Sequence, residues 1–124
     1  LDESQPTEIT LNRYAINPRT DGKRVLFSYG NFGPGTDLLL LDEEGQITTL
    51  AEDVLNYDMG DGFAVYTKDQ AVYVIALDTR KVYRLNSELS RGVLASVNGK
   101  RVCWYDVTSG YSDIDVIKYA NVRI

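Results

Sequence analysis

The residues that could do chemistry in this chain are serines, carboxylates and a glycine-rich segment, but their surroundings do not suit catalysis. The sequence contains no histidine, so Ser28 and Ser109 lack the usual general base of nucleophilic catalysis. Asp58 and Asp106 could be imagined as a glycosidase pair, but nothing in their spacing selects them. The glycines of residues 30–35 precede an expected strand and not a helix, which argues against a phosphate-binding loop. We therefore predict that the protein is not an enzyme.

Four acidic residues near the ends of expected strands carry the oxygen ligands that Ca²⁺ prefers: Asp37, Asp106, Asp113 and Asp115. They are scattered, and no EF-hand loop pattern is present. We favour Asx turns, in which the carboxylate accepts bonds from nearby backbone N–H groups, as the explanation of Asp37 and Asp113. We predict neither a metal site nor a cofactor.

A repeated turn followed by a strand organises the elements that hold these residues. The pairs Asp21-Gly22, Asp61-Gly62 and Asn98-Gly99 each precede a run of apolar, β-branched or aromatic residues. Such pairs favour a type I′ hairpin turn, which needs positive φ at both central positions. The pairs recur after 40 and then 37 residues. A period of this size indicates a repeat architecture.

Each repeat has four short strand-like runs. The expected strands are 13–16, 25–28, 37–41 and 47–50, then 55–59, 63–67, 71–77 and 82–85, then 92–96, 101–105, 114–119 and a short 122–124. Four strands per unit of about 40 residues are typical of a β-propeller blade. We predict an all-β fold with little or no helix, made of about three stacked four-stranded antiparallel blades. A β-sandwich with fortuitous repetition is the alternative.

The chain divides at the repeat boundaries into a single propeller segment. Residues 1–11 are expected to end a preceding blade, because residues 8–11 resemble 47–50 and 82–85. Blades are then expected over 12–53, 54–89 and 90–124. Three blades cannot close an ordinary ring of four to eight. We therefore expect either part of a larger propeller or self-association through the terminal blades, and light scattering would test the second.

Two segments of the chain resemble the TolB-like propeller repeat, a member of the WD40-like group. Residues 17–28 with 37–42 resemble its pattern S-P-D-G-K-x-I-x-F-x-S, a loop, and D-I-Y-x-x-D. Residues 98–106 with 112–116 resemble the variant V-W-Y-D-x-R-x-G-x-x-D-I-Y of bacterial and archaeal surface proteins. Arg19 and Thr20 lengthen the first turn, and the middle copy lacks the loop Asp and Gly.

The resemblance implies an extracytoplasmic module, in the periplasm or on the cell surface, that binds a protein or a glycan without catalysis. The alternative is a propeller domain that gates substrate access to an attached peptidase or other hydrolase. In a blade, the loop between the second and third strands shares a face with the connections between blades. We expect the binding face to contain Tyr29, Asn31, Phe32, Tyr57, Asp58 and Tyr111. The competing interpretation is that these rings pack between blades.

The bulk composition excludes some partners. The net charge of −5 and the scattered basic residues argue against nucleic acid. The longest apolar run, residues 38–41, is far too short to span a membrane. The single cysteine, Cys103, is expected to be a small buried hydrophobe. Trp104 is expected in the core between blades.

Overall fold

The computed structural model describes residues 6–9, 11, 14–30, 35–110 and 116–124, which form strands, turns and loops. The strands are β1 (Ala15–Thr20), β2 (Val25–Tyr29), β3 (Thr36–Leu41), β4 (Ile47–Val54), β5 (Asn56–Met59), β6 (Phe63–Lys68), β7 (Ala71–Ala76), β8 (Val82–Arg84), β9 (Gly92–Asn98), β10 (Arg101–Asp106) and β11 (Ile117–Asn121). All pairings between them are antiparallel. The predicted all-β class is confirmed.

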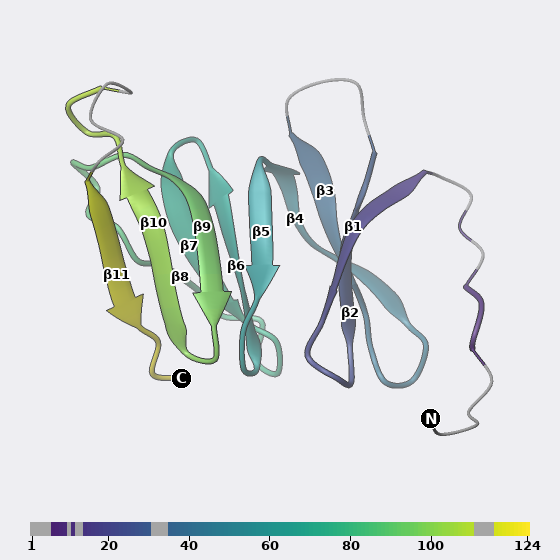
Figure 1. Ribbon diagram of the computed structural model, residues 1–124. Helices are drawn as coiled ribbons and strands as arrows, with labels where there is room; N and C mark the ends of the chain where they lie inside the picture. The colour runs from purple at the N-terminus through teal and green to yellow at the C-terminus, as the bar shows by residue number, and fades with distance from the viewer. Residues whose placement is uncertain (1–5, 10, 12–13, 31–34, 111–115) are drawn as a thin grey trace.

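The strands form three separate sheets, each built in chain order. Blade 1 has the order β1-β2-β3-β4, blade 2 the order β5-β6-β7-β8, and blade 3 the order β9-β10-β11. Figure 1 shows the three sheets side by side, with β1, β5 and β9 following one another across the middle. This arrangement is three stacked propeller blades, and it rules out the two-layer sandwich.

Two apolar cores join the blades. The first core lies between blades 1 and 2 and includes Leu26, Leu40, Tyr66 and Ile75. The second core lies between blades 2 and 3 and includes Phe63, Val65, Val72, Val74, Val102, Trp104 and Val122. Each middle strand contributes alternate residues to opposite faces, as strand geometry requires. The apolar run in β6 follows from this burial on both sides, because blade 2 lies between the other two blades.

Trp104 lies in the second core and is only 5% exposed, which confirms its predicted place. Cys103 is half-buried instead of buried, because it lies on the opposite face of β10, where no further blade covers it. Its Sγ atom lies 3.3 Å from Ser96 Oγ. The expected short strand at 122–124 is also wrong, although Val122 is buried and its backbone N–H donates to Lys100 O.

The first strand differs most from its predicted bounds. The sequence placed it at residues 13–16 with a turn at Pro18, whereas β1 runs from Ala15 to Thr20. Its pairing register with β2 shifts between Ile16 and Arg19. Asn17 has a φ of 56° at this bulge. Proline has no backbone N–H, so Pro18 is tolerated because it lies at a bulge in an edge strand.

The predicted type I′ turns are wrong at all three Gly-containing pairs. Only the glycine of each pair has positive φ, at 96°, 82° and 61° for Gly22, Gly62 and Gly99. A type I′ geometry instead joins β6 to β7, where Asp69 and Gln70 have φ values of 51° and 61°. Glycine is the residue that adopts positive φ most easily in such turns, but the pairing of β6 with β7 holds Asp69 and Gln70 in this conformation.

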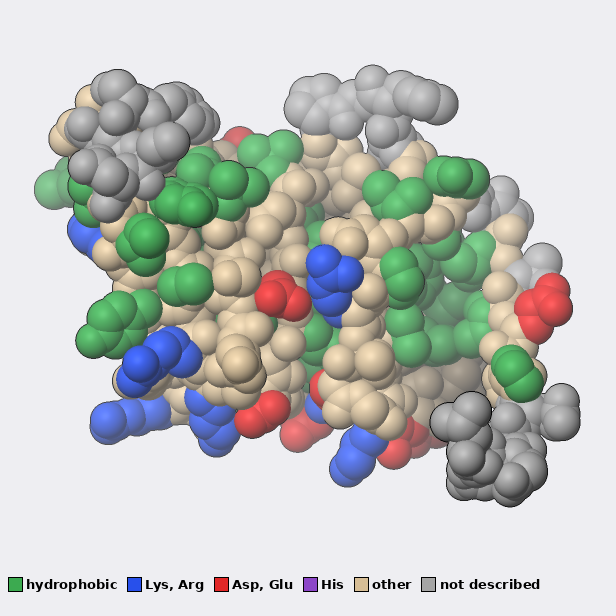
Figure 2. All heavy atoms as spheres, in the orientation of Figure 1, with side chains coloured by type: hydrophobic (Ala, Val, Ile, Leu, Met, Phe, Trp, Pro, Cys, Tyr) green, Lys and Arg blue, Asp and Glu red, His purple; other side chains and the backbone are tan. Residues whose placement is uncertain are grey.

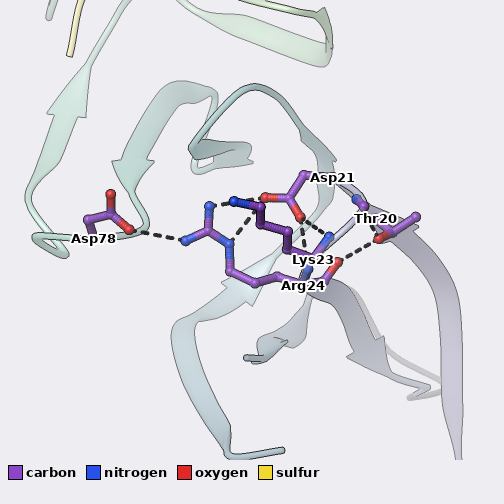
Figure 3. Close-up of polar contacts among 6 residues, drawn as sticks. Thr20, Asp21, Lys23, Arg24 and Asp78 are labelled. Carbon is purple, nitrogen blue, oxygen red and sulfur yellow. Dashed lines mark hydrogen bonds and ion pairs between the residues drawn. The ribbon is translucent and has the colours of Figure 1, made fainter. Parts of the chain in front are cut away.

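The Asp21 turn is a polar link between blades 1 and 2. Oδ1 of Asp21 accepts the backbone N–H groups of Lys23 and Arg24, at 3.0 and 2.8 Å. The Arg24 guanidinium donates to Asp21 Oδ2 and, through Nη1, to Asp78 Oδ1 at 3.2 Å. Figure 3 shows the Arg24 side chain between these two carboxylates. Burial favours the neutral acid, but these bonds outweigh it and lower the pKa of Asp21.

Gly60 and Gly62, which flank Asp61, provide a matched pair of substitutions. A Cβ atom on Gly60 would lie 2.6 Å from Phe63 Cζ and 2.8 Å from Gly99 O, whereas a Cβ on Gly62 meets nothing within 4 Å. We expect Gly60→Ala to lower the free energy of unfolding by about 2–3 kcal/mol through overpacking. Gly62→Ala is expected to lower it by about 1 kcal/mol through positive φ alone. Urea titration of both variants checks the order, and equal losses would contradict the steric explanation.

Candidate interaction groove between blades 1 and 2

Three of the six predicted binding residues, Tyr29, Tyr57 and Asp58, lie in the part of the chain that the structure describes. Tyr57 and Asp58 lie within strand β5, close to the strand expected over 55–59. Tyr29 is the last residue of β2 and is half-buried. Asn31, Phe32 and Tyr111 lie outside the described residues. Of the six, Tyr57 and Asp58 have their contacts defined in most detail, and both hold blades together.

Tyr57 faces blade 1 and is 6% exposed. Its hydroxyl group lies 2.8 Å from Asn17 O and 3.1 Å from Ser28 Oγ. Burial raises the pKa of the Tyr57 phenol, so the group is neutral at physiological pH and can donate its proton to one of these acceptors. The ring therefore belongs to the packing between blades, as the competing interpretation predicts.

Asp58 faces the opposite neighbour. Its Oδ2 accepts the backbone N–H of Val97 in β9 at 3.0 Å, and its Oδ1 accepts the N–H of Met59 at 2.9 Å. Arg19 Nε lies 3.7 Å from Oδ1, so the same carboxylate also contacts blade 1. Asp58 thus contacts both neighbouring blades, because β5 lies between the first strands of the other two sheets.

A cavity of about 380 Å³ opens beside these contacts, where blades 1 and 2 meet. We call it the inter-blade groove, and its polar lining includes Asn17, Arg19, Ser28, Thr36, Asn56 and Tyr57. The side chain of Arg19 is 45% exposed, and its ion pair with Asp58 is long. Its guanidinium donors therefore keep capacity for a further acceptor, since the group carries five N–H bonds. The groove has the chemistry to bind a carboxylate or amide oxygen.

Sequence reasoning missed Arg19, Asn17 and Asn56 as parts of this groove. The family resemblance makes Arg19 an insertion that lengthens a turn, whereas it lies in β1 after the bulge. The sequence does carry a signal for the bulge, namely Asn17 before Pro18. Asn is one of the few residues that tolerate positive φ, and Asn17 has this conformation. Nothing in the sequence places Asn56 opposite β9.

A second cavity of about 340 Å³ lies at one end of blade 3 and is lined by Ser87, Leu89, Ser90, Asp106, Thr108 and Lys118, among others. Lys118 Nζ lies 2.7 Å from Asp106 Oδ2, and the N–H of Thr108 donates to Oδ1 at 2.9 Å. The Lys118 ammonium and then the bonds from Thr108 lower the pKa of Asp106 to about 2. Asp106 is therefore ionised and already bonded, which suits a structural link between β10 and β11.

The Asp106 carboxylate makes stability depend on acid pH. Its pKa is about 2 in the folded protein against 3.8 for the free group, so it stabilises the fold above pH 3.8 and this contribution is lost as the pH falls toward 2. We expect Asp106→Asn to lower the free energy of unfolding by about 1–2 kcal/mol at pH 7 and by much less at pH 2. Urea titrations at both pH values check this. The exposed residue Glu52 supplies the control Glu52→Gln, and an equal Asp106→Asn loss at both pH values would contradict the assignment.

Within the described ranges, no three His, Cys, Asp or Glu side chains gather where they could hold a metal ion. Of the four acidic residues considered for Ca²⁺, Asp113 and Asp115 lie outside these ranges. In the same part of the chain, no helix is long and apolar enough to cross a membrane.

Comparison with known proteins found similar structures but no matching family model or curated sequence. The crystal structure of the N-terminal domain of Nup159 is similar over 98% of this chain and 32% of its own, with a TM-score of 0.57 and 16% identity. A chain of the S. cerevisiae complex of a Dbp5 variant with Nup159, a Gle1 variant, IP6 and ADP is similar over 82% of this chain and 28% of its own, with a TM-score of 0.51 and 18% identity.

This chain therefore spans about a third of the length of the structures that it resembles. At such identities the likeness concerns the fold alone. Together with the three stacked sheets, it identifies the chain as an all-β, propeller-like array of blades.

Proposed function

We propose that the protein is a non-catalytic interaction module that binds a protein partner in the inter-blade groove. The observation that carries this proposal is the half-exposed Arg19 side chain at the wall of a polar cavity of about 380 Å³. Arginine is enriched at the energetically dominant positions of protein interfaces, and its planar donors fit a carboxylate. We infer a partner that inserts an acidic or amide side chain.

The blades make the groove a rigid site. Tyr57 bonds to blade 1, and Asn56 and Asp58 bond to blade 3, so the groove wall from β5 is fixed on both sides. A prearranged site loses little side-chain freedom on binding, which favours affinity. The structurally similar Nup159 is found in a complex with Dbp5 and Gle1, which supports protein binding as a use of this architecture.

We propose that the module belongs to the TolB-like propeller proteins and is located in the periplasm or on the cell surface. This part of the proposal is supported by the resemblance of residues 17–28 and 98–106 to that repeat. A glycan is the other ligand that we consider, because the groove wall combines amide, hydroxyl and guanidinium groups. The absence of histidine from the sequence supports a role without catalysis.

The test compares the protein with Arg19→Glu and with Lys23→Glu, an exposed residue in the Asp21 turn that supplies the same change of charge. Proteins captured from the native source are quantified by mass spectrometry, and the binding of each purified candidate is then measured by calorimetry. We expect Arg19→Glu to lower the binding affinity for the true partner at least about tenfold, because reversing a charge in a fixed contact replaces attraction with repulsion. Lys23→Glu should leave binding unchanged.

Unchanged binding of every candidate to Arg19→Glu would overturn the groove as the site. Equal losses in both variants would show that net charge, and not the groove, controls binding. A thermal melt of Arg19→Glu within a few degrees of the unsubstituted protein would exclude unfolding as the cause of lost binding.

A further inference from the structure

The last blade exposes an apolar face. On the side of β10 and β11 away from blade 2, Ile117 and Tyr119 are 62% and 64% exposed, and Tyr105 lies beside Ile117 in the paired strands. Arg101 begins the same face and holds its guanidinium 4.9 Å from the Tyr119 ring centre. We call this the open face of blade 3. Neighbouring exposed apolar residues of this kind mark an interaction surface.

The corresponding face of each earlier blade is buried by the blade that follows it. Two residues after Arg24, Leu26 is completely buried against blade 2, and Val65 at the matching place in β6 is buried against blade 3. Cys103 occupies this place in blade 3, two residues after Arg101, and is only half-buried. The same contact thus forms twice within the chain, and the open face of blade 3 has the geometry to form it a third time.

The first contact also shows the charges that accompany such packing. Arg24, after the Asp21 turn, pairs with Asp78 in the β7–β8 turn of the following blade. Arg101 follows the Asn98 turn in the same way. The β3–β4 turn of blade 1, which corresponds to the β7–β8 turn, carries three consecutive acidic residues, Asp42, Glu43 and Glu44. A basic residue on blade 3 and an acidic turn on blade 1 are therefore complementary.

Blade 1 has an apolar hollow on its own outer side, between its sheet and the segment that holds Ile9 and Leu11, and Phe27 within it is only 6% exposed. This hollow has a volume of about 220 Å³ and is lined by Ile9, Leu11, Ile16, Pro18, Val25 and Phe27, among others. Figure 2 shows hydrophobic side chains lining a recess near the N-terminal residues, at the right of the view. We call this the open face of blade 1. It lies at the opposite end of the array from the open face of blade 3.

We propose that the open face of blade 3 packs on the open face of blade 1 of a second copy of this chain, with Arg101 placed against that copy's β3–β4 turn. Because the two faces differ, the contact runs head to tail, and such contacts close into rings when the rotation allows. Two copies supply six blades, within the range of closed propellers. Each ring contains the contact twice, so the second contact forms at high effective concentration.

The array also explains the N-terminal segment. Residues 8–11 resemble 47–50, which begin β4, and 82–85, which include β8, the outermost strands of blades 1 and 2. Blade 3 has no strand beyond β11 in the part of the chain that the structure describes. In the proposed ring, Ile9 and Leu11 of one copy lie against the open face of blade 3 of the other copy.

The test measures the mass of the full chain in solution by sedimentation equilibrium over a wide range of concentrations. We expect a reversible monomer–dimer equilibrium. Ile117→Asp should abolish the dimer, whereas Leu89→Asp, at a fully exposed position outside the open face, should not change it. Arg101→Glu should weaken the dimer roughly tenfold, because both contacts in the ring become repulsive. Combining Arg101→Glu with Glu44→Arg should restore most of the affinity.

A monomeric mass at every concentration up to the solubility limit would overturn the proposal and leave the face to a further blade of a longer chain or to another protein. Open-ended growth beyond the dimer would overturn ring closure. If Ile117→Asp and Leu89→Asp dimerise equally well, another surface is the interface. Circular dichroism spectra that match among the variants show that the substitutions leave the fold intact.

Discussion

Replacing Trp104 with alanine is expected to lower the free energy of unfolding by about 3–5 kcal/mol, the largest effect of any substitution proposed for this chain. Trp104 is 5% exposed and packs in the second core with Phe63, Val65 and Val72. Gly92 fits closely beside it, since a Cβ atom there would lie 2.8 Å from Trp104 Cδ1. Truncation therefore leaves a cavity that the rigid neighbouring strands cannot fill.

Trp104→Phe separates the ring packing from the indole N–H. Among the described residues, Nε1 of Trp104 is buried without a hydrogen-bond partner, and an unsatisfied buried donor destabilises the folded state. Phenylalanine removes this donor and keeps most of the ring, so we expect a loss of less than about 1.5 kcal/mol. Urea titration measures both variants, with Leu89→Ala as the exposed control. A Trp104→Ala loss below about 1 kcal/mol would contradict the role of the second core.

The second large effect is expected for Asn56→Ala, which should lower the free energy of unfolding by about 2–4 kcal/mol. The Asn56 amide donates from Nδ2 to Ala95 O at 2.8 Å and accepts at Oδ1 from the N–H of Ala95 at 3.2 Å. Oδ1 also accepts the hydroxyl of Thr67 at 2.7 Å. The side chain thus replaces a backbone pair between β5 and β9, which belong to different sheets. Alanine would leave all three partners unsatisfied near the second core.

Asn56→Asp is the matched variant, because the carboxylate keeps the two acceptor bonds but places an oxygen, in place of the donor, against Ala95 O. We expect both variants to destabilise the protein, since Asn56→Ala loses all three bonds and Asn56→Asp replaces one of them with a repulsive contact. Native-state hydrogen exchange provides a second readout, since Asn56→Ala should release the amides of β9 and β10 before those of blade 1. Uniform loss of protection across the three blades would show that Asn56 is not a specific link between blades 2 and 3.

The contacts of Tyr57 and Asp58 with other blades are not visible in the sequence. A tyrosine and an aspartate in a short polar strand carry no local sign of the strands beside them. The Tyr57 hydroxyl meets residues about 40 positions earlier, and Asp58 meets Val97, 39 positions later. These partners are set by the stacking of blades, which the alternation of apolar residues predicts in outline but not in register.

The sequence by itself determined the class of fold, the number of blades and the strands of the middle blade. The spacing of Asp21, Asp61 and Asn98 predicted the repeat, and the apolar run 63–67 predicted a strand buried on both faces, as β6 is. These features are local, because strand length, alternation and turn residues act over a few positions.

Only the tertiary structure decided the turn geometry, the bulge at Pro18, the inter-blade groove and the two open faces. The type I′ geometry at Asp69 and Gln70, for example, arises from the pairing of β6 with β7, against the preference of the turn residues themselves. Arg19 and Asn56 gain their roles from residues in other sheets. Such contacts depend on how whole blades pack, and their free energy is shared among many side chains distant in sequence.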